Sequence, residues 1–107
     1  MPRAQFAEFL KQKETKDDQG QNFWNKGHWI DAVECKWEEG YQKYRIAFSP
    51  TPKDKAHWWF WYFDMDADFF EKRLTDYSTR GFQLVYYNKS VNPNGKEIFA
   101  AVWHKTE

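Results

Sequence analysis

The sequence is short of the residues that mark secreted, disulfide-stabilised or membrane-spanning proteins. It has one cysteine, Cys35, among 107 residues, which excludes an internal disulfide and supplies at most one metal thiolate. No window approaches 18 consecutive apolar residues, so no transmembrane helix and no membrane partner are expected. The first 14 residues lack the uninterrupted apolar core of a secretory signal. The compartment stays unknown on these grounds, with the cytoplasm slightly favoured.

An excess of charge of either sign is also absent. Lysine plus arginine and aspartate plus glutamate both total 16, so the formal net charge is zero. Proteins that bind nucleic acid usually carry a basic patch that neutralises phosphates. The sequence has no such patch, and we expect no nucleic-acid partner.

Aromatic residues are abundant, at 21% of the chain, with seven Trp, six Tyr and ten Phe. Each aromatic side chain buries a large area, so a few of them can build the core of a small domain. A chain of 107 residues argues for one domain. Its fractions of 41% hydrophobic and 30% charged residues are ordinary for a globular protein.

The hydrophobic pattern predicts an α+β fold with two helices and an antiparallel sheet of about five strands, in the order α-β-β-β-α-β-β. The expected helices cover residues 3–15 and a segment that begins near 66–68 and stops at Gly81. The expected strands cover residues 28–37, 41–48, 57–63, 82–91 and 96–104. In the first strand, residue parity places Trp29, Val33, Cys35 and Trp37 on one face, with Asp31 as the discordant member.

Two local signals set the ends of the second helix and of the last hairpin. Asp68 and Glu71 have capping-box spacing, and Asp66 is an equally plausible N-cap. Asn94-Gly95 is a strong hairpin signal between the last two strands. The final strand is apolar on both parities, so we expect it in the centre of the sheet.

The two halves of the sequence resemble each other at a nearly constant offset. Residues 27–33 can be laid on 81–85 and residues 44–48 on 99–103, at offsets of 54 and 55 positions. A constant offset indicates duplication. We therefore interpret residues 1–107 as a single domain. It comprises a diverged repeat unit at about 3–48, an aromatic strand at 57–63 and a clear repeat unit at about 66–105.

The second unit resembles a known family. The residues that carry the resemblance are Trp61-Tyr62, Met65, Phe70, Gly81-Phe82, Leu84-Val85, Gly95 and Phe99-Ala100-Ala101-Val102-Trp103. Over residues 58–105 they look like bacterial tandem repeat domain 1, a module similar to the non-catalytic N-terminal region of polyglycine hydrolases. The resemblance implies an α+β module with antiparallel hairpins, no cofactor and no assigned catalytic residues. In those hydrolases a β-lactamase-like serine hydrolase domain supplies the chemistry.

Catalytic motifs are correspondingly weak. A β-lactamase-type hydrolase needs Ser-x-x-Lys at the start of a helix, whereas Ser49 and Lys53 are one residue too far apart. Cys35 could pair with His28, His57 or His104 in a small thiol-dependent enzyme, with Asp31 orienting the base. The parity of Cys35 favours a buried, inert thiol instead.

Metal motifs are weak as well. Asp64, Asp66 and Asp68 invite a calcium site, but the run lacks the glycine and the final glutamate of a calcium loop. These acids are better explained by the N-terminus of the following helix. The three histidines lack H-x-x-x-H spacing, so we expect no zinc and no other metal.

Aromatic recognition is the remaining candidate for function. A platform for a protein, a peptide or a polysaccharide such as a cell-wall polymer could be formed by Trp58, Trp59, Trp61, Tyr62, Tyr86, Tyr87 and Trp103. Each of these residues is also a plausible core residue. The sequence therefore predicts a non-catalytic interaction or scaffold module, monomeric or homodimeric, with the thiol-dependent enzyme as the alternative.

Overall fold

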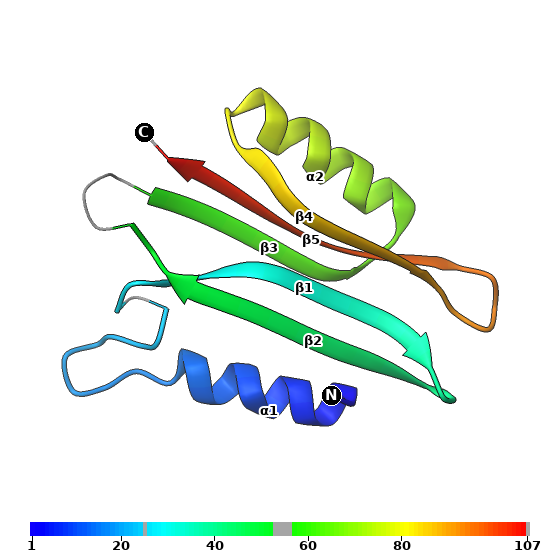
Figure 1. Ribbon diagram of the computed structural model, residues 1–107, viewed down its shortest axis with the longest axis horizontal. Coiled ribbons are helices and arrows are strands. Elements are labelled where there is room, and N and C mark those ends of the chain that lie inside the picture. The colour runs from blue at the N-terminus through cyan, green and yellow to red at the C-terminus, as the bar shows by residue number, and fades with distance from the viewer. Residues whose placement is uncertain (25, 53–56, 107) are drawn as a thin grey trace.

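The computed structural model describes residues 1–24, 26–52 and 57–106, and of His57 and Thr106 the backbone only. It contains two helices and five strands in the predicted order (Figure 1). Their bounds are α1 Arg3–Glu14, β1 His28–Glu38, β2 Tyr41–Pro50, β3 His57–Met65, α2 Ala67–Thr79, β4 Gln83–Val91 and β5 Glu97–Thr106. The α+β fold class is confirmed. None of the described helices is both long and apolar enough to cross a bilayer.

The five strands form two antiparallel sheets, where the sequence suggested one. β1 pairs with β2, and β5 lies between β3 and β4 in a three-stranded sheet. The central position predicted for the final strand is thus confirmed. Figure 1 shows α1 and α2 on opposite margins of the strands.

The sheets remain separate because side chains take the place of a backbone ladder along the free edge of β1. The Cys35 N–H donates to Asn88 Oδ1 at 3.0 Å, and Ser90 Oγ donates to the Cys35 carbonyl at 2.9 Å. His104 Nε2 donates to the Ile30 carbonyl at 2.7 Å. Asn88 and Ser90 belong to β4 and His104 to β5, so side chains of the three-stranded sheet satisfy both backbone groups of Cys35 and the carbonyl of Ile30.

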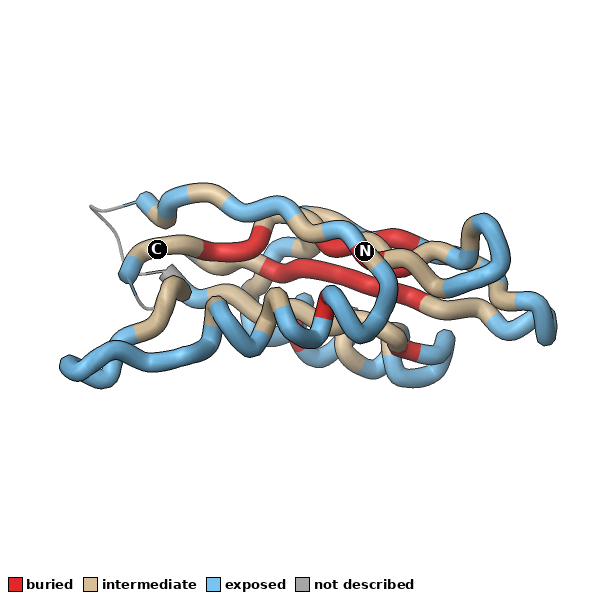
Figure 2. The backbone as a smooth tube through the Cα atoms, turned by 90° about the horizontal axis from the view of Figure 1, so that it is seen from below, coloured by how far each residue is buried: buried red, intermediate tan, exposed pale blue. Residues whose placement is uncertain are grey.

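Two clusters of buried residues fill the two faces of the three-stranded sheet. The first cluster lies on the face of the three-stranded sheet that is turned away from α2, and it packs this face against α1 and the two-stranded sheet. Its fully buried members are Phe6, Ile30, Val33, Cys35, Tyr44, Ala100 and Val102. The other lies under α2 and consists of Met65, Tyr77, Phe99, Ala101 and Trp103. Figure 2 shows the buried segments concentrated in the central strands, while the helices and hairpin ends are largely exposed. β5 contributes to both clusters because its alternate residues point to opposite faces.

The parity predicted for β1 is wrong before residue 32. Ile30 pairs with Phe48 and Ala32 with Ala47, so Asp31 is an extra residue in a β-bulge. A bulge shifts the alternation by one position. Ile30 therefore lies with Val33 and Cys35 in the core cluster. Trp29 points to the other face and stacks on His104, with 3.7 Å between the ring centres.

The hairpins β1–β2 and β4–β5 have β-bulges at corresponding positions, 54 residues apart in the sequence. The β1 bulge between Ile30 and Ala32 has its counterpart in β4 between Leu84 and Tyr86. A glycine with positive φ precedes each hairpin, Gly27 at 101° and Gly81 at 84°. The helices match too, since Phe6 stacks on Tyr44 at 4.8 Å and Phe70 on Phe99 at 4.6 Å. A duplication predicts such shared features, and the duplication itself stays a prediction.

Candidate binding site

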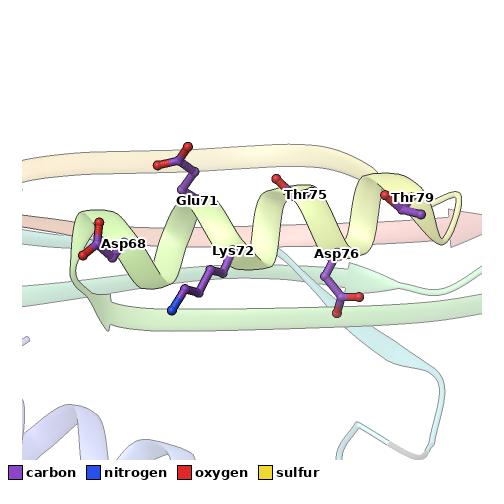
Figure 3. Close-up of a pocket in the computed structure, with 6 residues that line it drawn as sticks. All are labelled: Asp68, Glu71, Lys72, Thr75, Asp76 and Thr79. Atoms are coloured by element: carbon purple, nitrogen blue, oxygen red, sulfur yellow. The ribbon is translucent and has the colours of Figure 1, made fainter.

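One surface hollow lies along the outer side of α2. It measures about 620 Å³ and is lined by Asp68, Glu71, Lys72, Thr75, Asp76 and Thr79 (Figure 3). All six side chains belong to one helix and are exposed. No second element forms an opposing wall among these lining residues, so the hollow is the solvated face of an amphipathic helix. We do not consider it a binding site.

A second hollow, of about 430 Å³, has walls from three parts of the chain. Trp58 and Phe60 come from β3, Arg80 and Phe82 from the turn between α2 and β4, and Lys105 from β5. Trp58 is the floor residue with most freedom to meet a ligand, because 48% of its surface is exposed. We call this hollow the Trp58 pocket.

The Trp58 pocket combines aromatic faces with two cationic groups. The Arg80 guanidinium lies 5.7 Å from the Phe60 ring centre and 5.6 Å from that of Phe82. Lys105 Nζ lies 5.9 Å from the Trp58 ring centre and donates to the Arg80 carbonyl at 3.2 Å. Cation–π contacts of this kind hold the positive groups against the aromatic floor. A pocket with this lining suits a ligand that has both an apolar face and negative charge.

The predicted aromatic platform is divided among several places in the fold. Trp59 and Trp61 are half-buried against the cluster that contains α1, and Tyr62 is half-buried against the cluster under α2. The Tyr86 hydroxyl donates to Glu34 Oε1 at 3.1 Å, and burial raises the pKa of this tyrosine. Tyr87 is 56% exposed beside Phe70, on β4.

Trp103 is fully buried and cannot touch a ligand at the surface. Among the seven predicted residues, only Trp58 lines the Trp58 pocket. Sequence reasoning missed Phe60, Arg80, Phe82 and Lys105. The cross-strand pairing of Trp58 with Lys105 was the available signal, but it requires the register of β3 on β5.

The candidate thiol does not have the surroundings of a nucleophile. Cys35 is fully buried, and burial raises the pKa of its thiol to about 11. The ring Nδ1 of His28 lies 3.2 Å from the Phe23 carbonyl, and the ring of His104 donates to Ile30. The side chain of His57 lies outside the described residues. A thiol with so high a pKa has little thiolate at neutral pH.

The acidic run before α2 has structural roles. Asp64 accepts hydrogen bonds from the Tyr44 hydroxyl at 2.8 Å and pairs with Arg3. Asp66 is the N-cap, because its Oδ1 accepts from the Phe69 N–H at 2.8 Å, and Asp68 follows in the first turn. Among the described residues, no three His, Cys, Asp or Glu side chains converge as a metal site would require.

Of the Ser49–Lys53 pair, Lys53 lies outside the described residues. Ser49 itself accepts a hydrogen bond from Trp29 Nε1 at 3.2 Å. That contact ties the end of β2 to the start of β1, which is a structural role.

The segment from β3 to β5 has the form of a structural repeat, a strand followed by a helix and a hairpin. Residues 57–106 match the family described as polyglycine hydrolase-like, structural repeat. The predicted resemblance is confirmed for this segment, and residues 1–56 lie outside the match. Neither the comparison with curated proteins nor that with solved structures gave a match. A repeat of this family fits a non-catalytic module.

Proposed function

We propose that this protein is a non-catalytic interaction module that binds a carboxylate-bearing polymer segment in the Trp58 pocket. The observation that carries the proposal is the pairing of a half-exposed Trp58 with Arg80 and Lys105 in one open hollow. The polymer is an acidic peptide or an acidic cell-wall polymer. The family match supports the non-catalytic part of the proposal.

The chemistry of the lining supports this ligand class. The face of an indole ring packs against a sugar ring or an apolar side chain, and its area makes it an effective anchor. Arg80 recognises a carboxylate with its planar donor fork, whereas Lys105 supplies a point charge. Neither step needs a nucleophile or a general base, which agrees with the burial of Cys35.

The test is a titration of the full chain with two charged probes and their neutral counterparts. The probes are a glutamate- and tyrosine-containing peptide and a uronic-acid oligosaccharide. We expect at least one charged probe to shift the NMR signals of Trp58 and Arg80, with weaker binding at higher salt. Trp58→Ala should reduce affinity about tenfold, the loss expected for a central aromatic anchor.

Trp37→Ala is the matched control, because Trp37 is 40% exposed but lies in β1, outside the pocket. It should leave affinity unchanged. Equal losses for the two variants, or no binding of any charged probe, would contradict the proposal. The probe that binds identifies the polymer class.

A further inference from the structure

The outer edge of β2 pairs with the two residues that precede α1. The Tyr44 N–H donates to the Met1 carbonyl at 2.7 Å, and the Met1 amino group donates to the Tyr44 carbonyl at 2.6 Å. Pro2 forms an antiparallel bridge with Lys43. The two residues before α1 therefore pair with β2 in the manner of a strand end, and they show that Tyr44 turns its backbone groups away from β1.

The next outward-facing residues of β2 are Ile46 and Phe48, because backbone groups alternate along a strand. The partners of these residues on β1 confirm the alternation. Tyr44 is opposite Cys35 and Phe48 is opposite Ile30, and both β1 residues direct their backbone groups to side chains of the other sheet. Within the described part of the chain, no hydrogen bond joins the outward groups of Ile46 and Phe48 to another segment.

In the second unit the corresponding edge is filled by β3. At the offset of 55, Tyr44 corresponds to Phe99, Ile46 to Ala101 and Phe48 to Trp103. These three β5 residues pair with β3, at Met65, Tyr62 and Phe60. Met1 precedes α1 as Met65 precedes α2, so Met1 on β2 corresponds in position to Met65, the last residue of β3 on β5. The family match also begins at β3, which makes the strand part of the repeat.

The helix flank next to this edge predicts which side chains a strand paired with it would carry. In the second unit, Tyr62 of β3 lies under Arg73 of α2, whose guanidinium is 5.5 Å from the ring centre. Phe6 stacks on Tyr44 as Phe70 stacks on Phe99, so Phe6 of α1 corresponds to Phe70 of α2. Three residues further along each helix, Phe9 therefore corresponds to Arg73. A half-buried phenylalanine there favours an apolar neighbour. On the opposite face, Arg45 and Ala47 are exposed and favour a polar one.

We propose that the outer edge of β2 accepts an extended strand of another polypeptide, antiparallel to β2, with aromatic and polar residues in alternation. Strand addition of this kind gains affinity from main-chain hydrogen bonds and specificity from alternate side chains. The aromatic residues face α1 as Phe60 and Tyr62 face α2. Pro50 has no N–H and ends the pairing, which leaves Arg45–Ser49 as the docking edge. This edge is independent of the Trp58 pocket.

The probe is a nine-residue peptide based on β3. It keeps phenylalanine and tyrosine at the positions of Phe60 and Tyr62 and carries threonine or lysine at the alternate positions. With the full chain, we expect this peptide to slow amide hydrogen exchange of Ile46 and Phe48 by about tenfold. A peptide with proline at its centre should not do so. Unchanged exchange with the first peptide would overturn the proposal.

Two variants separate backbone pairing from contact with the ring of Phe48. Phe48→Ala and Phe48→Pro both remove the ring, which is 38% exposed, but only proline also removes the outward N–H. That N–H is not used in the pairing with β1, so both variants should fold. The peptide should protect Ile46 in Phe48→Ala and not in Phe48→Pro. Equal protection in the two variants would overturn strand addition.

A second copy is the competing occupant of the edge. Sedimentation of the free chain tests it, because pairing of β2 with β2 of another molecule produces a dimer in which Ile46 and Phe48 are already protected. We expect the amide hydrogens of Ile46 and Phe48 to exchange rapidly when the peptide is absent. A dimer protected at these two amides would overturn the proposal.

Discussion

Asn88 joins the two sheets through a single side chain. Its Oδ1 accepts the Cys35 N–H at 3.0 Å, and only 9% of its surface is exposed. A backbone N–H that is buried on folding loses its hydrogen bond to water. A buried side chain that accepts a hydrogen bond from this N–H therefore stabilises the fold. Asn88 thus serves the backbone of β1 in place of the neighbouring strand that β1 lacks on that edge.

Asn88→Ala should lower the free energy of unfolding by about 1–3 kcal/mol, because it leaves the Cys35 N–H buried and unpaired. Urea denaturation followed by far-UV circular dichroism measures this loss. Asn94→Ala, in the exposed hairpin turn, is the control and should change stability by less than about 0.5 kcal/mol. A similar loss in the two variants would show that the Asn88 hydrogen bond contributes nothing specific.

Single residues were the least predictable part of this protein from sequence. Trp58 and Trp103 are both tryptophans on aromatic strands, yet one is 48% exposed and the other is fully buried. The difference arises because β3 is an edge strand while β5 is central, with α2 covering Trp103. Residue type cannot distinguish these positions, and the binding role of Trp58 stays a prediction.

Whole elements were predicted far better, because each has a local cause. Hydrophobic spacing, the acidic run before α2 and the Asn94-Gly95 turn fixed two helices and five strands to within a few residues. The bulge at Asp31 was missed, since one extra residue leaves no local mark other than a discordant polar side chain. The division into two sheets was also missed, because it depends on contacts of Asn88 and Ser90 with a strand more than 50 residues earlier.

The capping of α2 gives a prediction at this scale. Asp66→Ala removes the acceptor for the Phe69 N–H and should cost about 1 kcal/mol. Asp68→Ala is the matched control, because Asp68 lies in the first turn without capping a backbone N–H in the described structure and acts through the helix dipole alone. Its loss should be smaller and should shrink further at high salt. If Asp68→Ala costs as much as Asp66→Ala in urea denaturation, the assignment of the cap is wrong.

At the scale of the molecule, the two units are held together by one shared cluster. β1 of the first unit places Ile30, Val33 and Cys35 against Ala100 and Val102 of the second, and all five are fully buried. The two units have matching bulges, as two copies of one plan would have, yet the units are not independent. Each unit covers apolar surface that the other would expose to water, so we expect them to unfold together as a single domain.

Ile30→Ala tests this cooperativity. Truncating a fully buried isoleucine should cost about 2–5 kcal/mol, while Val91→Ala, at a position 53% exposed, should cost less than about 1 kcal/mol. Native-state hydrogen exchange then reports on each unit separately through the amides of β2 and of β5. If the units share one core, Ile30→Ala lowers protection by the same factor in both strands, because both exchange through the same global opening. A loss confined to β2, with β5 as protected as before, would show that the second unit is stable without the first.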